Sequence, residues 1–411
     1  MKVKLPQLAW YEPKELELTL PDSWQVELAS MAGHNRPAMK REEIEKRVKN
    51  PIGMPPLREL AKGRKEVVII FDDMTRVTRS AEIVPFILEE LKEAGIADDR
   101  IRFIAGIGLH GTMDRIDFTK KLGEEVVARF PVYNHNAFDD CTYVGTTSTY
   151  ETKVYVNQEV MNCDLKIAIG SVVPHPMCGY GGGGKLILPG VCSFETIKEN
   201  HLTYTEDRRE AKDKTKFKMG LHGKNPLRAD IDEAAALAHL DMIVNCIFNS
   251  WGETVDIFAG TMKEAFEAAV EAAKTHYLTP RLEDKDIVIA NTYAKANEAA
   301  IGLIISFPAV RKGGGDVVLI ANAPDGLVPH YLRRWGKWDP GILPNQAIPE
   351  KVRRLIFYTE YPEINTKNWV EESERILVLY KWNEVLEVLK EAHGSKAKVG
   401  VYPNAEIQYS P

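Results

Sequence analysis

Apolar and polar positions follow two patterns along the chain, and together they predict its fold class. Continuous apolar runs bounded by polar residues are typical of buried parallel strands, and residues 65–72, 100–108 and 165–173 have this pattern. Residues 81–94 show instead the spacing of an amphipathic helix, which is expected to stop at Gly95. Strands that alternate with helices indicate an α/β fold with mainly parallel sheets.

A polar, proline-containing segment at residues 275–286 interrupts this pattern and is a candidate linker. Four apolar runs after it are expected to be strands: residues 286–293, 316–326, 375–381 and 397–403. We therefore predict two Rossmann-like α/β domains, with the active-site cleft between them. Residues 1–275 would form the cofactor-binding and catalytic domain, and residues 282–411 would form a second domain that closes the cleft.

Composition narrows the class of protein. The chain has 411 residues, of which 44% are hydrophobic, and a net charge of -6, which argues against a nucleic-acid binder. Its longest apolar stretch, residues 299–310, is too short to span a membrane, and the N-terminus lacks an apolar signal core. The five cysteines form no Cys-x-x-Cys pair, so a reducing, cytoplasmic location is expected. An oligomer is compatible with all of these observations.

The segment HPMCGYGGGGKLILPG, residues 175–190, is the most distinctive local pattern. It resembles a phosphate-binding loop, but Leu186 stands where such a loop needs Ser or Thr, and Pro189 breaks the helix that should follow. A flexible turn with a solvated lysine is one interpretation. The other is a backbone that passes close to a ligand, with Lys185 as a nucleophile in a desolvated site.

Other polar residues also lie at or after predicted strand ends. His110, His175 and His201 are candidates for general bases or for ligands of nickel or zinc. The segment FDDMTRVTR, residues 71–79, contains two carboxylates and two guanidinium groups. It is either a helix cap with solvated arginines or a site for a phosphate or a carboxylate.

Taken together, these segments resemble the lactate racemase family that uses a nickel-pincer nucleotide. The resemblance is strongest over residues 166–201, and it includes DDMTR (72–76), GIGLHGTM (106–113) and the region from Asn225 to Ala265. It is dense over residues 65–270 and thinner beyond. In this family the protein is an isomerase, a racemase or epimerase that inverts C2 of a 2-hydroxy acid through a 2-keto acid.

The resemblance implies a role for each matching residue. Lys185 would form a thioamide with the cofactor, nickel pyridinium-3,5-bisthiocarboxylic acid mononucleotide, and His201 would be a ligand of the nickel ion. His110 and His175 would be the two catalytic bases. The remaining cofactor contacts would come from Asp73, Thr75, Arg76, Gly182, Gly183 and Gly184, the first three touching either its phosphate or the substrate carboxylate. Enzymes that synthesise the cofactor are expected partners.

The chain departs from the family pattern in its second half. In NTYAKANEAA, residues 291–300, Tyr293 matches, but Asn297 stands at the place of the family's substrate lysine, and Lys295 is two residues away. These three residues and Arg79 are the candidate substrate contacts. We therefore expect a 2-hydroxy acid other than lactate.

Two alternatives come from other classes of protein. A zinc hydrolase could use the three histidines around an activated water. A non-catalytic carrier of a nucleotide or of nickel could use the same residues for binding alone.

Overall fold

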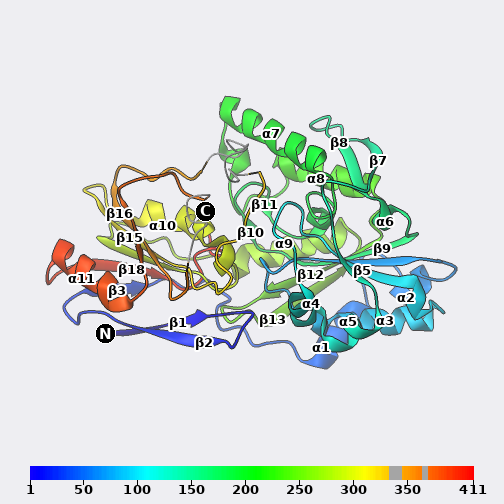
Figure 1. Ribbon diagram of the computed structural model, residues 1–411, viewed down its shortest axis with the longest axis horizontal. Helices are drawn as coiled ribbons and strands as arrows, with labels where there is room; N and C mark the ends of the chain where they lie inside the picture. Colours follow the sequence, from blue (N-terminus) through cyan, green and yellow to red (C-terminus); the bar gives the residue numbers. More distant parts are fainter. Residues whose placement is uncertain (333–344, 363–368) are drawn as a thin grey trace. The chain divides into compact units, whose positions relative to one another are not determined.

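The computed structural model describes residues 1–332, 345–362 and 369–411 (Figure 1). The chain divides into two compact units, each of which contains a six-stranded sheet. Unit 1 comprises residues 1–35, 250–252 and 275–411, and unit 2 comprises residues 36–249 and 253–274. No described helix is long and apolar enough to cross a membrane.

Unit 2 is built on a sheet with the strand order β13-β12-β9-β4-β5-β6. The strands are β4 (Val67–Phe71), β5 (Ile101–Ala105), β6 (Val132–Asn134), β9 (Leu165–Ser171), β12 (Met242–Phe248) and β13 (Thr254–Gly260). All neighbours pair in parallel except β12 and β13. β4, β9 and β12 are buried along their whole length, which explains their continuous apolar runs.

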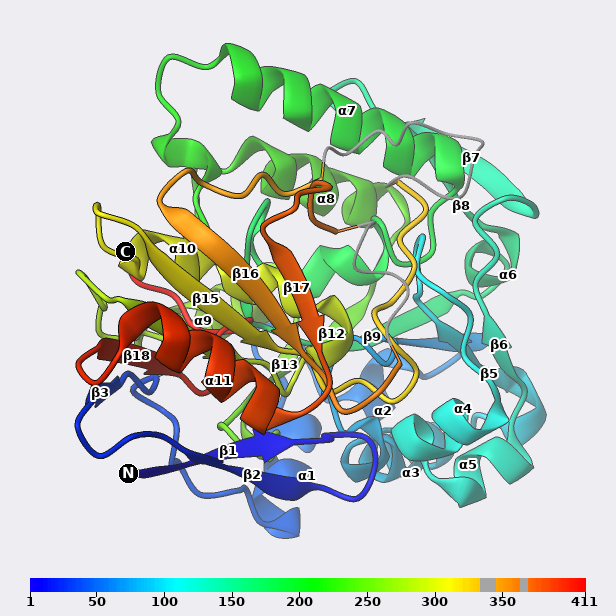
Figure 2. The same cartoon turned by 60° about the vertical axis from the view of Figure 1, so that its left-hand side comes forward.

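Helices cover both faces of this sheet. One set comprises α1 (Arg41–Lys49), α2 (Leu57–Leu60), α3 (Val84–Glu93), α4 (Arg115–Leu122) and α5 (Glu124–Arg129). The others are α6 (Gln158–Met161), α7 (Phe194–Glu210), α8 (Pro226–Leu237) and α9 (Glu264–His276). Both views show α7 and α8 on the opposite side of the sheet from α1, α3 and α5 (Figures 1 and 2).

Short elements complete unit 2. They are the 3-10 helices η1 (Ser80–Glu82), η2 (Asp98–Arg100), η3 (Gly183–Leu186) and η4 (Thr215–Phe217), and the paired strands β7 (Cys141–Thr146) with β8 (Lys153–Asn157) and β10 (Pro174–His175) with β11 (Gly179–Tyr180). The predicted helix over residues 81–94 is thus a 3-10 turn followed by α3.

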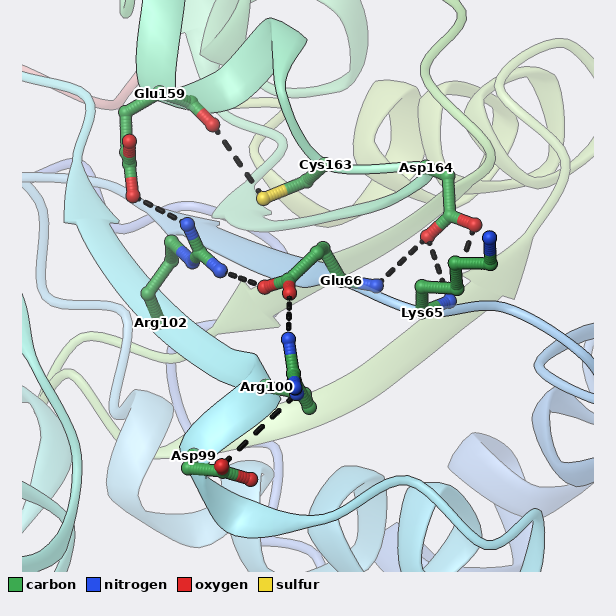
Figure 3. Close-up of polar contacts among 8 residues, drawn as sticks. All are labelled: Lys65, Glu66, Asp99, Arg100, Arg102, Glu159, Cys163 and Asp164. Carbon is green, nitrogen blue, oxygen red and sulfur yellow. Dashed lines mark hydrogen bonds and ion pairs between the residues drawn. The ribbon is translucent and has the colours of Figure 1, made fainter.

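Charged residues hold together the amino ends of β4, β5 and β9 (Figure 3). Glu66 forms ion pairs with Arg102 and, at 2.6 Å, with Arg100. The Asp164 carboxylate accepts hydrogen bonds from the backbone N–H groups of Lys65 and Glu66. This network therefore lies at the edge of the sheet opposite to the carboxyl ends of the same strands.

Unit 1 contains a second parallel sheet, with the order β17-β16-β15-β14-β18-β3. Its strands are β3 (Gln25–Leu28), β14 (Ile287–Asn291), β15 (Gly315–Ile320), β16 (Val352–Tyr358), β17 (Ile376–Leu379) and β18 (Lys398–Tyr402). The other elements are β1 (Lys2–Gln7), β2 (Lys14–Thr19), η5 (Ala296–Gly302), α10 (Leu303–Ala309) and α11 (Trp382–His393). Separate apolar clusters pack around this sheet, one with α10 and the other with the β1–β2 hairpin and α11.

The α/β class with parallel-rich sheets is confirmed, and so are the strands predicted from apolar runs. The expectation for residues 1–35 differs from the structure, because these residues group with the C-terminal segment and not with residues 36–249. The cause is β3, which pairs in parallel with β18. β3 is short and its side chains are mostly exposed, so it has no apolar run that would predict a strand.

Candidate functional site

Three loops of unit 2 contain most of the predicted site residues. They follow β4, β5 and β9, which are neighbours in the sheet and run in parallel. The carboxyl ends of such strands lie at one edge, where ligands bind in open α/β sheets. The topology thus brings the residues after Phe71, Ala105 and Ser171 to one edge of the sheet.

The loops after β4 and β5 are joined by Asp73 and His110. The Nδ1 atom of His110 lies 2.6 Å from Oδ2 of Asp73. The other oxygen of this carboxylate accepts hydrogen bonds from the backbone N–H of Thr75, at 2.9 Å, and from its hydroxyl. Burial raises the pKa of Asp73, but His110, Arg76 and these hydrogen bonds outweigh it and lower the pKa to about 2.

Within the protein, these residues contact one another and His110. Asp73 binds His110 and Thr75, and Nη1 of Arg76 donates to the Thr75 hydroxyl at 2.6 Å. Their contact with a cofactor phosphate or the substrate carboxylate stays a prediction. Arg79 is partly buried just before η1. An ionised Asp73 therefore serves to hold His110.

A buried lysine, which we did not predict, holds the loop after β4 in place through its contacts with Asp72 and Arg76. Lys121 of α4 is fully buried, and its Nζ atom lies 2.7 Å from Oδ1 of Asp72 and 2.8 Å from the carbonyl oxygen of Arg76. The Thr78 hydroxyl donates to the second oxygen of Asp72. The signal in the sequence is weak: Lys121 lies three residues after the buried Phe118, on the same helix face.

The loop after β9 brings His175 and Lys185 together. His175 ends β10, and its Nδ1 accepts hydrogen bonds from the backbone N–H groups of Met177 and Cys178, at 3.2 and 3.3 Å. Its Nε2 lies 3.2 Å from Nζ of Lys185, which is in η3. The histidine and the lysine singled out in the sequence are thus direct neighbours.

His201 lies on α7, a helix whose N-terminus is capped by the Ser193 side chain. It is buried, and its Nδ1 donates to the carbonyl oxygen of Ile197 at 2.8 Å. Burial lowers the pKa of His201 to about 4, and any positive charge on Lys185 adds to this effect. The imidazole is therefore neutral near pH 7, with its tautomer fixed so that Nε2 carries the lone pair, as in metal-binding histidines.

The glycine loop is required by packing within the protein. A Cβ atom on Gly182 would lie 2.7 Å from Oδ1 of Asn245, and one on Gly183 would lie 2.8 Å from Nη2 of Arg228. Asn245 accepts a hydrogen bond from the backbone N–H of Gly183, and Arg228 donates to the carbonyl oxygen of Gly182. The same holds for Gly184, whose Cβ would meet protein atoms at 3.1 Å. Packing within the protein thus already requires glycine at these positions, and their contact with the cofactor stays a prediction.

The remaining predicted residues lie in unit 1, after β14. Lys295 is fully buried and forms an ion pair with Glu298 at 3.1 Å. Tyr293 donates its hydroxyl hydrogen bond to the carbonyl oxygen of Trp251, and the backbone carbonyl of Asn297 accepts from Val328. In this arrangement the Lys295 charge is already paired with a carboxylate.

The described part of the chain contains no group of three or more His, Cys, Asp or Glu side chains arranged to hold a metal ion. His110, His175 and His201 accordingly do not form the three-histidine cluster that a zinc hydrolase would use.

The chain is similar to known lactate racemases in sequence. Residues 11–213 match the family model of the lactate racemase N-terminal domain. The chain is 27% identical to a lactate racemase from Thermoanaerobacterium thermosaccharolyticum over 424 residues, which cover 96% of both chains. It is 29% identical to a lactate racemase from Lactiplantibacillus plantarum over 324 residues, 77% of this chain and 74% of the relative.

Two solved structures have a similar fold. The structure of the lactate racemase apoprotein from Thermoanaerobacterium thermosaccharolyticum matches all of both chains with a TM-score of 0.74 and 22% identity. A crystal structure of a protein from Thermotoga maritima matches 90% of this chain and 98% of that chain, with a TM-score of 0.67 and 18% identity.

Proposed function

Because this chain belongs to the lactate racemase family, we propose that it inverts the C2 stereocentre of a 2-hydroxy acid with the help of a nickel-pincer nucleotide. It is an isomerase of the racemase and epimerase class. The zinc hydrolase and the non-catalytic carrier are not favoured, since the curated relatives are named as racemases.

The residues of unit 2 fit the cofactor that we propose. Lys185 would hold it covalently, and His201 would supply a ligand to nickel through Nε2. The fit rests on His201, whose neutral ring and fixed Nδ1–H suit a metal ligand. When bound, the cofactor supplies an acceptor for the C2 hydride, which avoids formation of a carbanion next to a carboxylate.

His110 is proposed to take the proton of the C2 hydroxyl. Ionised Asp73 accepts the Nδ1–H of His110, so that the lone pair of the neutral ring is at Nε2. The same carboxylate stabilises the imidazolium that forms when Nε2 takes a proton. His175, on the loop after β9, is the second proposed base.

The observation that carries the proposal is the pairing of Asp73, on the loop after β4, with His110, on the loop after β5. The loop after β9, the other neighbour of β4, brings His175 next to Lys185. The test is co-expression with cofactor-synthesis enzymes of the family, which are proposed partners, followed by intact-mass and metal analysis. We expect a covalent mass addition, nickel, and racemisation of at least one 2-hydroxy acid detected by chiral chromatography. Lys185→Ala should lack the added mass. Loaded wild-type protein that inverts no 2-hydroxy acid would refute the proposal.

The substrate is proposed to be a 2-hydroxy acid other than lactate, with a larger or more polar side chain. Asn297 is a neutral amide at the place of the family's substrate lysine, and Lys295 cannot replace that lysine while it is paired with Glu298. A panel of 2-hydroxy acids assayed with the loaded enzyme should therefore show a higher kcat/KM for a substrate other than lactate. The highest value for lactate would contradict this prediction.

A further inference from the structure

We infer that Glu406 is a positioning residue that fixes the loop after β14, and with it Tyr293 and Asn297, two of the candidate substrate contacts. Glu406 lies in the segment that follows β18, near the end of the chain, and the proposed proton chemistry does not use it. Its contacts with the loop come from the structure, whereas its effect on the substrate rests on the proposed function.

Glu406 follows a strand at the point where the strand order of the unit 1 sheet reverses. From β14 the chain adds β15, β16 and β17 on one side, and it then returns to place β18 on the other side of β14. In open α/β sheets, ligands bind outside the carboxyl ends of the strands at such a point. The loops after β14 and β18 meet here, because the backbone N–H of Ala405 donates to the carbonyl oxygen of Asn291 at 2.8 Å.

The Glu406 side chain binds the backbone donors of the loop after β14. Its Oε1 atom accepts hydrogen bonds from the backbone N–H groups of Tyr293, at 3.0 Å, and Lys295, at 3.3 Å. Backbone N–H groups that converge in a turn commonly bind an anion. In this loop a side chain of the protein itself takes that place, so the backbone has a fixed internal partner.

Burial makes this contact difficult to replace. Glu406, Tyr293 and Lys295 are all buried. Burial raises the pKa of Glu406, while the backbone N–H groups of the loop act in the opposite direction because they favour the charged form. Buried backbone N–H groups need an acceptor, so the loop would have to move if Glu406 no longer supplied one.

The same stretch of backbone carries the candidate substrate contacts. The Tyr293 hydroxyl donates to the carbonyl oxygen of Trp251 at 2.9 Å. The carbonyl oxygen of Asn297 accepts from the backbone N–H of Val328 at 2.8 Å. Glu406 holds the backbone at the start of this stretch, so its loss should displace Tyr293 and Asn297. Substrate binding should then weaken more than the chemical step, in which Glu406 takes no part.

Hydrogen exchange measured by mass spectrometry tests the contact in the full-length protein without cofactor or substrate. Peptides that contain residues 292–297 should exchange about tenfold faster in Glu406→Leu than in wild type. Glu406→Gln keeps an acceptor oxygen on a side chain of the same length and should exchange like wild type. Glu406→Asp keeps the carboxyl group but is one methylene shorter, so it should exchange faster, and it replaces Glu406→Leu if that variant does not fold. Wild-type exchange in Glu406→Asp would overturn the inference.

Asp316 provides the matched control, because it is also a buried carboxyl group of unit 1. It lies near the amino end of β15, where it contacts Arg354 at 2.7 Å and His393 at 2.8 Å, at the edge of the sheet opposite to the loop after β14. Asp316→Asn should lower the free energy of unfolding and leave the exchange of residues 292–297 as in wild type. Equally fast exchange in Asp316→Asn and Glu406→Asp would show that the loop responds to any loss of stability, and would overturn the inference.

Steady-state kinetics of the loaded enzyme test the effect on the substrate. Glu406→Asp should raise KM for the best 2-hydroxy acid about tenfold with a smaller change in kcat, and Glu406→Gln should restore KM. A wild-type KM in Glu406→Asp would overturn the link to the substrate, even if the loop exchanges faster. Inactive loaded wild-type protein would refute the proposed function, whereas the exchange experiment would still decide whether Glu406 holds the loop.

Discussion

The carboxylate of Asp73 is the single group on which the proposed proton chemistry depends most directly. In Asp73→Asn the amide oxygen would keep the two donors from Thr75, which places the NH₂ group against Nδ1 of His110. Nδ1 must then accept, and Nε2 carries the hydrogen. We expect kcat to fall by about 10²–10⁴-fold with little change in the folded state, measured by steady-state racemisation and circular dichroism.

A variant in the same contact set provides the control for Asp73. Thr75→Val removes a hydroxyl that donates to Asp73 but keeps the carboxylate and its contact with His110. Its loss of kcat should be smaller than that of Asp73→Asn. An Asp73→Asn enzyme that works at the wild-type rate would show that this carboxylate does not set the state of His110.

Lys185 leads to a prediction about amine reactivity in the cofactor-free protein. Because Nε2 of His175 lies 3.2 Å from Nζ, where it can take a proton from the amine, Lys185 should be acylated faster than an ordinary lysine at pH 8. Peptide mass spectrometry after a short pulse of acetic anhydride measures this. Lys198 on α7 is exposed and serves as the internal reference. His175→Phe should remove the advantage of Lys185. Equal labelling of Lys185 in wild type and in this variant would contradict the prediction.

At the scale of elements, helix α4 determines the shape of the loop after β4 through Lys121. Lys121→Met would remove the cationic partner of the buried Asp72 carboxylate. Removal of one partner of a buried ion pair costs about 3–5 kcal/mol. Urea unfolding should show a lower free energy of unfolding by an amount of this size. The double variant Lys121→Met with Asp72→Asn should recover part of it, because no buried charge remains. A single variant as stable as wild type would exclude this role.

The elements differ in how far the sequence could predict them. β4, β9 and β14 are buried on both faces, so their apolar runs were sufficient. β3 has the sequence QVEL, and its place in the sheet depends on pairing with β18 at the other end of the chain. Pairing between distant segments of this kind produces no pattern of apolar residues within β3, so the strand could not be predicted from its own sequence.

The site shows the same limit. Residue type and position after a strand were enough to select His110, His175 and Lys185. Their partners could not be predicted, because the contacts of His110 with Asp73 and of Asp72 with Lys121 join different loops or helices. The sequence also does not reveal the side chains of α8 and β12 that pack against the glycines near Lys185.

Considered as a whole molecule, the chain uses opposite edges of the unit 2 sheet for different purposes. The amino ends of β4, β5 and β9 hold the charged network around Glu66 (Figure 3), and the carboxyl ends hold the proposed proton chemistry. Substitutions in the ion-pair network around Glu66 therefore do not touch the residues at the carboxyl ends of the strands. Such variants are useful controls, because they change the stability of the fold without altering the proposed site.

The other unit depends on the beginning of the chain, and this gives the last prediction. The backbone N–H of Gln25 donates to the carbonyl oxygen of Ala397 at 2.8 Å, which ties β3 to β18, while the side chain of Gln25 is exposed. Gln25→Pro removes this N–H, and a lost donor of this kind costs about 1–3 kcal/mol. Gln25→Ala keeps the N–H and should change stability by less than about 0.5 kcal/mol.

Thermal and urea unfolding of the full-length protein compare the two variants. If residues 1–35 belonged to the N-terminal domain, as their position in the sequence suggests, Gln25→Pro and Gln25→Ala would have similar free energies of unfolding. A clear loss of stability with Pro alone would instead show that β3, within the first 35 residues, completes the sheet of unit 1 by pairing with β18 near the end of the chain.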